Sequence, residues 1–99
     1  MNNIALVLTD EAIDALDRLE KDKSKTRILK DAVKTLNLME KNLRHPSLNT
    51  HEYTALKGPK GEKAFEAYAQ QKASGAYRIF WYYGPGKNVI SVFAIVPHP

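Results

Sequence analysis

Basic and titratable side chains in the second half of the chain could support acid–base chemistry on an anionic substrate. Residues 51–99 hold six lysine and arginine side chains against three acidic ones, Glu52, Glu62 and Glu66. Arg78 keeps its charge, and its planar fork can hold two phosphate oxygens at once. The imidazole of His98 can exchange a proton near neutral pH. The formal net charge of +4 also favours an anionic partner, without naming one.

Other kinds of chemistry are not expected. The chain has no cysteine, so thiol chemistry, disulfides and thiolate metal sites are excluded. Its three histidines are scattered without the spacing of a metal site, and we expect neither a metal centre nor a cofactor. His45 and His51 are interpreted as solvent-exposed loop residues.

Length and composition predict one domain over residues 1–99. A chain of 99 residues is too short to bury two cores of useful size, and its 43% hydrophobic and 26% charged residues are typical of a soluble protein. No apolar run approaches the roughly 20 residues that span a bilayer, and the opening Met-Asn-Asn does not resemble a signal peptide. We therefore expect a cytoplasmic protein without membrane contact.

The first half of the chain predicts a strand and two helices. The apolar run Asn3–Leu8 is typical of a buried strand. Apolar residues at helical spacing predict a helix over residues 10–21, capped by Thr9 or Asp10. The same spacing predicts a second helix from an N-cap at Ser24 to near Arg44, because a proline soon follows. So short a connection makes the two helices antiparallel.

The second half predicts a loop and then a strand-rich region. From Pro46 to Gly61, prolines and glycines interrupt any period, apart from an extended piece at Tyr53–Leu56, which indicates a crossing loop. Residues 63–71 fit a helix and a strand equally well. The aromatic and β-branched segments Ala76–Tyr83 and Val89–Val96, joined by a glycine–proline turn, predict a β-hairpin.

Side chains alternate along the first strand of this hairpin. Tyr77, Ile79 and Trp81 share one face, so Arg78 lies on the other. The apolar face should pack on the helices, which makes Arg78 point away from them. The order of the elements predicts an α+β fold in which an antiparallel two-helix hairpin, preceded by an N-terminal strand, packs on one face of a small antiparallel sheet. The other face of the sheet is expected to be open.

Three segments in this order resemble the RelE/ParE superfamily of bacterial toxins. They are Thr9-Asp10-Glu11-Ala12 after an apolar strand, Gly75-Ala76-Tyr77-Arg78-Ile79, and Ile90–Ile95 followed by Pro97-His98. The layout matches over the whole chain, although the specific motifs lie in the C-terminal hairpin. The resemblance implies the order β-α-α-β-β-β and favours a strand at Ala64–Gln70, on which Glu66, Tyr68 and Gln70 would share a face and flank Arg78.

Many toxins that this pattern resembles cut messenger RNA in the ribosomal A site, where the 2′-hydroxyl attacks the adjacent phosphate. A base takes the 2′ proton, a cation offsets charge in the transition state, and an acid protonates the leaving 5′ oxygen. The resemblance and the residue types assign these roles to Glu66, Arg78 and His98, in that order. The structural alternative is a plain surface pair between Arg78 and Glu66.

Further side chains are expected to hold RNA. Tyr68 or Tyr82 could donate a hydrogen bond or stack on a base. Lysines of the loop and strands would bind phosphates, with a steep dependence on salt. These lysines are Lys57, Lys60, Lys63, Lys72 and Lys87.

The chain stops at His98-Pro99, where many RNA-cleaving relatives continue into a basic or tyrosine-containing tail. Residues of that tail cannot be carried over to this sequence. Either His98 does their work alone, or the activity is weaker, different or lost.

Two functions follow from the resemblance. One is a ribosome-dependent mRNA endoribonuclease that inhibits translation. The other is a non-catalytic binding role, as a ParE-type poison of DNA gyrase or as a member that only binds an antitoxin; the fold hosts both. The histidine after the last strand favours RNA cleavage. Either function implies a cognate antitoxin protein, the first adds the ribosome and mRNA, and a homodimer is left open.

Overall fold

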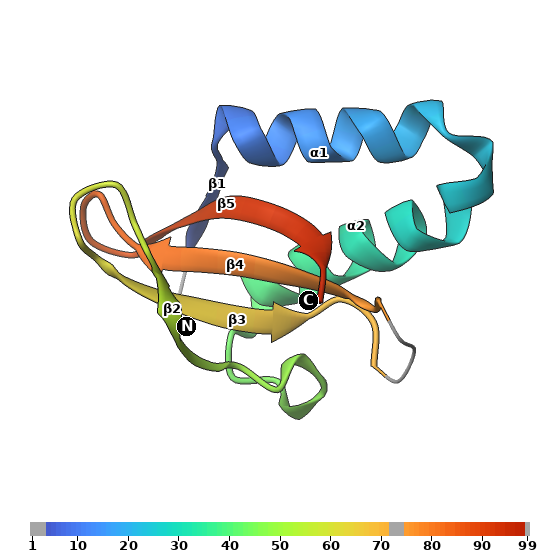
Figure 1. Ribbon diagram of the computed structural model, residues 1–99. Coiled ribbons are helices and arrows are strands. Elements are labelled where there is room, and N and C mark those ends of the chain that lie inside the picture. Colours follow the sequence, from blue (N-terminus) through green and yellow to red (C-terminus); the bar gives the residue numbers. More distant parts are fainter. Residues whose placement is uncertain (1–3, 72–74, 99) are drawn as a thin grey trace.

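The chain folds into a mixed sheet with two helices on one of its faces (Figure 1). The computed structural model describes residues 4–71 and 75–98. The helices and strands, with two short 3-10 turns, are β1 (Ala5–Leu8), α1 (Asp10–Lys21), η1 (Lys23–Lys25), α2 (Thr26–Lys41), η2 (Pro46–Leu48), β2 (His51–Lys57), β3 (Lys63–Tyr68), β4 (Tyr77–Tyr83) and β5 (Val89–Pro97). The expected α+β class and the order of its main elements are confirmed, and β2 is an additional strand.

The strands lie in the order β1-β5-β4-β3-β2. Four of them form an antiparallel set through β5, β4, β3 and β2, whereas β1 runs parallel to β5. The expectation of a wholly antiparallel sheet is therefore wrong at β1. No tight turn joins β1 to β5, so local sequence does not fix their relative direction.

The two helices begin and end close to their predicted positions. Thr9 caps α1 by accepting a hydrogen bond from the Ala12 amide at 3.3 Å, as expected. The predicted cap at Ser24 is wrong, because Ser24 lies in η1 and α2 starts at Thr26 without a side-chain cap. The second helix also ends at Lys41, before the expected Arg44. Within the described residues, neither helix has both the length and the apolar character needed to cross a membrane.

The core lies between the helices and the sheet. Both helices cover the same face, and they run antiparallel (Figure 1). The helices contribute small and aliphatic side chains, and β4 contributes the alternating set that was predicted to face them. The buried cluster includes Ala12, Leu19, Ala32, Leu36, Met39, Tyr77, Ile79, Trp81, Ile90, Val92 and Ile95.

The two edge strands differ from the expectation. β1 was expected to be buried, yet Val7 is 46% exposed and the strand alternates between exposed and half-buried positions, because it has a neighbour on one side only. Position Asn3 lies outside the described residues. β2 lies in the segment that was expected to form a crossing loop, and it contains the extended piece expected at Tyr53–Leu56. Its side chains are mostly exposed, so it lacks the apolar pattern by which strands are recognised.

The ambiguous segment before the hairpin is a strand, as the family resemblance implied. β3 ends at Tyr68, two residues before the expected end at Gln70. Its alternation places Glu66 and Tyr68 on the face opposite the helices, together with Arg78. That face is not open around them: Tyr53 of β2 packs on Phe80 with 4.9 Å between ring centroids. Glu66 is also contacted by His51 and His98 and Arg78 by Tyr68, and the two residues are only 2% and 6% exposed.

Candidate functional site

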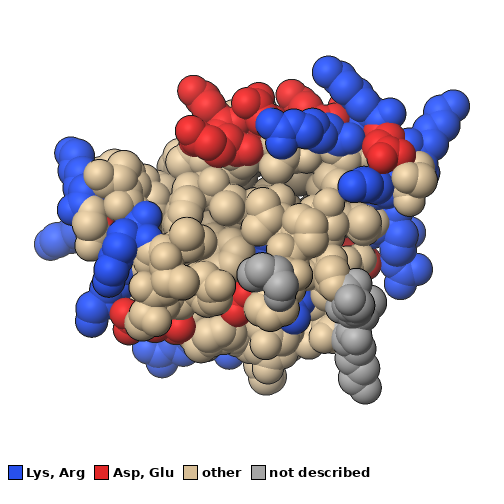
Figure 2. Space-filling view, in the orientation of Figure 1, with Lys and Arg blue, Asp and Glu red and all other residues tan. Residues whose placement is uncertain are grey.

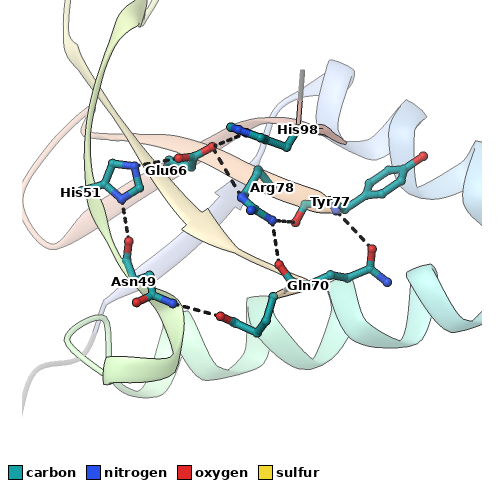
Figure 3. Close-up of polar contacts among 8 residues, drawn as sticks. Asn49, His51, Glu66, Gln70, Tyr77, Arg78 and His98 are labelled. Atoms are coloured by element: carbon teal, nitrogen blue, oxygen red, sulfur yellow. Dashed lines mark hydrogen bonds and ion pairs between the residues drawn. The ribbon is translucent and has the colours of Figure 1, made fainter. Parts of the chain in front are cut away.

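The β3–β4 ladder brings the predicted site residues together on the sheet face away from the helices. Tyr68 lies directly opposite Arg78, and Glu66 pairs with Phe80 two residues along. His98 follows β5, and its amide donates a hydrogen bond to the Ala76 carbonyl at 2.8 Å. This bond places the imidazole beside the start of β4, where it points toward Glu66 (Figure 3).

The carboxylate of Glu66 is the centre of the group. Its Oε2 lies 3.8 Å from Arg78 Nε and 3.6 Å from His98 Nδ1. The Glu66 side chain is 3% exposed, whereas that of His98 is 46% exposed. Neither Glu66 Oε2 nor Arg78 Nε has a hydrogen-bond partner among the described residues. A buried acceptor and a buried donor thus lie near each other without forming a hydrogen bond, which is unusual in a protein interior.

Arg78 is held in place by contacts other than its ion pair. Its Nη1 donates to the carbonyl of Gln70 at 2.7 Å and to that of Tyr77 at 3.3 Å. Its Cζ stacks 3.7 Å from the centre of the Tyr68 ring, a cation–π contact. The guanidinium is therefore a fixed, buried positive charge. The alternative of a plain pair with Glu66 agrees with the observed partner, but the pair is buried and does not lie on the surface.

His51 is a member of the cluster that was not predicted. It was interpreted as a loop residue, but it lies at the start of β2, in register with Glu66. Its Nε2 is 2.7 Å from Glu66 Oε1, and its Nδ1 is 2.7 Å from the Asn49 carbonyl oxygen. The side chain is 46% exposed. The start of β2 has no periodic pattern of apolar residues in the sequence. The contact between His51 and Glu66 becomes evident only from the pairing of β2 with β3.

The arrangement is suited to moving protons beside an anion. A buried carboxylate lies between two half-exposed imidazoles, and a fixed guanidinium stands next to it (Figure 3). Imidazoles can exchange protons near neutral pH, and a fixed cation can offset negative charge that develops on a substrate. Among residues 4–71 and 75–98, no group of histidine and acidic side chains is arranged to hold a metal ion.

Four of the predicted phosphate-binding lysines, Lys57, Lys60, Lys63 and Lys87, lie apart from this cluster. Figure 2 shows basic side chains on the left of the molecule, over the β2–β3 and β4–β5 turns; Lys57 and Lys63 flank the first of these turns and pair in register, and Lys60 lies within it. Lys87 belongs to the second turn. Lys63 starts β3 and Tyr68 ends it, so about 17 Å of strand separate this lysine from the position opposite Arg78. Lys72 lies outside the described residues.

The two predicted tyrosines differ in their surroundings. Tyr68 belongs to the cluster, because the guanidinium of Arg78 stacks on its ring and because it makes a T-shaped contact with His51, with 6.0 Å between ring centroids. Tyr82 is only 6% exposed and packs against Phe93. The structure thus places Tyr68, but not Tyr82, where a bound base could reach it.

Three solved structures of bacterial and archaeal proteins are similar to the whole chain. A YoeB/ParE toxin from Agrobacterium tumefaciens is 11% identical, with a TM-score of 0.67 over 97% of this chain and 100% of that one. The archaeal RelE–RelB complex from Pyrococcus horikoshii OT3 is 14% identical, with a TM-score of 0.64 over 96% and 94%. The YoeB dimer from Staphylococcus aureus is 11% identical, with a TM-score of 0.61 over 98% and 99%.

Sequence comparison adds nothing to these likenesses, because neither a family model nor a curated protein matches the chain. The structural likeness extends over almost the full length of both partners in each pair. The chain therefore has the RelE/ParE-like toxin fold.

Proposed function

We propose that this protein is the toxin of a type II toxin–antitoxin pair and that it inhibits translation by cleaving messenger RNA on the ribosome. The observation that carries the proposal is the convergence of Glu66, Arg78 and His98 on one face of a RelE/ParE-like sheet. Fold alone does not determine function. A buried carboxylate, a fixed cation and an accessible imidazole are, however, the groups that cleavage by a 2′-hydroxyl requires.

Each residue has a role in the proposed reaction. Glu66 Oε2, the carboxylate oxygen without a hydrogen bond among the described residues, accepts the 2′ proton as the O2′–P bond forms. Arg78 stabilises the negative charge on the phosphate oxygens. His98 donates a proton to the 5′ oxygen as the P–O5′ bond breaks, which leaves a 2′,3′-cyclic phosphate and a 5′-hydroxyl. His98 lies beside Oε2 and is half-exposed, so displacement of its ring by bound RNA uncovers the carboxylate.

The remaining predicted residues contribute binding in this proposal. Tyr68 offers an aromatic surface next to the cluster, and the lysines of the two turns bind phosphates away from the scissile bond. All four of the described lysines are exposed: Lys57, Lys60, Lys63 and Lys87. Such contacts raise the affinity for RNA or the ribosome without taking part in the bond cleavage.

Partners are proposed by analogy with the similar structures. One of them is a RelE–RelB complex and another is a YoeB dimer. We infer that this chain is likewise neutralised by a cognate antitoxin protein. We also propose that it can form a homodimer, which a measurement of its molecular mass in solution would test. The same setting implies action in the cytoplasm, where ribosomes and messenger RNA are present.

The decisive experiment is induced expression in a bacterial host, followed by primer extension on abundant messenger RNAs. Growth arrest with discrete breaks inside coding sequences is the expected result. Arg78→Ala should abolish the breaks, and its folding should be checked by circular dichroism. Arrest with trapped gyrase–DNA complexes and intact messenger RNA would instead identify a gyrase poison. Absence of arrest, with binding to an antitoxin retained, would identify a non-catalytic member.

A further inference from the structure

His51 occupies a position in the site that no motif of the sequence indicated. We propose that His51 is a positioning residue which shares one proton with Glu66 and thereby holds the carboxylate with Oε2 directed at the substrate. The inference rests on the proposed RNA cleavage and deepens it. It assigns no direct contact between His51 and the reacting atoms.

The hydrogen bonds of the His51 ring determine which of its nitrogens carry protons. Nδ1 lies 2.7 Å from the Asn49 carbonyl oxygen. A carbonyl oxygen only accepts hydrogen bonds, so Nδ1 must carry a hydrogen. Nε2 lies 2.7 Å from Glu66 Oε1, and an ionised carboxylate also only accepts. A neutral imidazole and an ionised carboxylate would therefore bring two lone pairs together at that distance, and one proton must lie between them.

The charges around the pair decide where this proton resides. Arg78 Nε is 3.8 Å from Glu66 Oε2, and both side chains are buried, so the guanidinium favours the ionised form of the carboxylate. His51 is 46% exposed, which lets water solvate a charge on its ring. The other groups of the site near its ring are Tyr68, in a T-shaped contact with 6.0 Å between ring centroids, and His98 on the far side of Glu66. The pair is therefore an imidazolium and a carboxylate.

The bond between His51 and Glu66 gives the two carboxylate oxygens different roles: one holds the carboxylate in place and the other is left for the substrate. Oε1 is occupied by His51, and Oε2 is left without a hydrogen-bond partner among the described residues. A carboxylate bound on one side cannot rotate freely, so the free oxygen keeps its direction toward Arg78 and His98 (Figure 3). Fixing a reacting group by a neighbouring hydrogen bond is a general means of preorganisation.

The anchor of His51 is itself fixed to another part of the fold. Asn49 adopts a left-handed conformation, with φ at 49°, and its Nδ2 donates to Gln71 Oε1 at 3.0 Å. Gln71 in turn donates through Nε2 to the Ser47 carbonyl at 2.8 Å. These bonds tie the segment before β2 to the residues that follow β3. The imidazole is thus held between a fixed carbonyl and the carboxylate that it positions.

Three substitutions separate the two bonds of His51. In His51→Gln the side-chain amide can reach the Nε2 position and still donate to Glu66. In His51→Asn the amide matches the Nδ1 position and retains only the bond to Asn49. His51→Ala removes both. His45→Ala is the matched control, because the side chain of His45 bonds only to Ser47 among the described residues and lies outside the proposed machinery.

Single-turnover cleavage of ribosome-bound messenger RNA gives the expected order. His51→Ala and His51→Asn should each lower the rate by about 10- to 100-fold, as loss of an orienting partner commonly does, whereas His51→Gln should recover most of it and His45→Ala should be unchanged. Rescue by glutamine but not by asparagine separates positioning of the carboxylate from a purely structural role of the imidazole, which both variants would disturb alike.

The outcomes distinguish this inference from the proposed function. If the wild type does not cleave RNA, both fail. If the wild type cleaves and His51→Ala cleaves equally fast, the role of His51 is refuted while the proposed function stands. Equal rates for the Gln and Asn variants would also refute it. Independently of activity, ¹⁵N NMR of the free protein at neutral pH should show both ring nitrogens of His51 protonated, and an unprotonated Nε2 would contradict the shared proton.

Discussion

Glu66 and Arg78 face each other from neighbouring strands at 3.8 Å, and both side chains are more than nine-tenths buried. The geometry is too long for a hydrogen bond, so the two charges attract without being fully satisfied. Burial of charges costs free energy that a perfect pairing would offset. A buried ion pair is weak evidence for a contribution to stability, and both side chains belong to the cluster for which a reaction is proposed.

Removing one member of this pair should destabilise the fold. In Arg78→Met the Glu66 carboxylate keeps His51 but loses its buried cation, and the free energy of unfolding should fall by about 3 kcal/mol. The double variant Glu66→Gln/Arg78→Met should lose less than the sum of the two single variants. Urea denaturation measures all three, and additive losses would argue against coupling between the two side chains.

A surface ion pair provides the comparison for this cycle. Arg27 and Asp31 lie one turn apart on α2, with Nε and Oδ1 at 3.2 Å, and the arginine is 83% exposed. Arg27→Met should cost less than about 1 kcal/mol, because water screens the charges. A loss as large as that of Arg78→Met would show that burial is not the reason for the difference.

His98 should matter for cleavage far more than for folding. Its ring is half-exposed and follows the last strand, so His98→Ala removes little packing and should leave the melting temperature nearly unchanged. Loss of the general acid should lower single-turnover cleavage by about 10²- to 10⁴-fold. A substrate whose leaving group needs no proton should be cleaved by His98→Ala at close to the wild-type rate. If the variant remains slow on that substrate, His98 is not the acid.

The lysines of the β2–β3 turn should act on binding rather than on the chemical step. The triple variant Lys57→Ala/Lys60→Ala/Lys63→Ala should weaken the affinity for ribosome-bound RNA and reduce the slope of log affinity against log salt by about one for each phosphate that is no longer bound. At saturating protein the cleavage rate should be retained. The charge-matched control is Lys30→Ala/Lys34→Ala/Lys41→Ala on α2, which should keep the wild-type slope.

The turn between α1 and α2 should have a stability that depends on pH, because of Asp22. The hydroxyl and then the amide of Ser24 donate to its carboxylate, and these bonds lower the pKa of Asp22. The stabilisation that the carboxylate gives to the turn is therefore present at neutral pH and is lost as the pH falls through the lowered value. An NMR titration should find a pKa below the ordinary range, and Ser24→Ala should raise it.

The sequence predicted the parts of the fold whose signals are local. In β4 and β5 the density of aromatic and β-branched residues strongly favours a hairpin. The alternation at Tyr77 and Ile79 correctly indicated the face of β4 that packs in the core. β2 was indicated only by the short extended piece at Tyr53–Leu56, because an exposed edge strand needs no apolar period. The parallel β1–β5 pair was missed because strands so distant in the chain have no turn that fixes their direction.

The candidate site was predictable only for the residues that lie on the paired strands β3 and β4. Glu66 and Arg78 share a face by simple alternation, so their proximity follows once β3 is accepted as a strand. The burial of Glu66 could not be foreseen, since one of its contacts comes from His51, which was expected to be a loop residue. His51 depends on the register of β2 against β3, and that pairing shifts between Glu52 and Lys57. Such an irregularity leaves no trace in composition or spacing.

The parallel pairing of β1 with β5 has a consequence for how the protein comes into being during synthesis. When the chain has emerged only as far as α2, the first strand still lacks its neighbour, and the helices have no sheet on which to pack. His98 follows β5, so the imidazole can reach Glu66 only after β5 has been made. A nascent chain that ends before β5 therefore lacks both the neighbour of β1 and the imidazole beside the buried carboxylate.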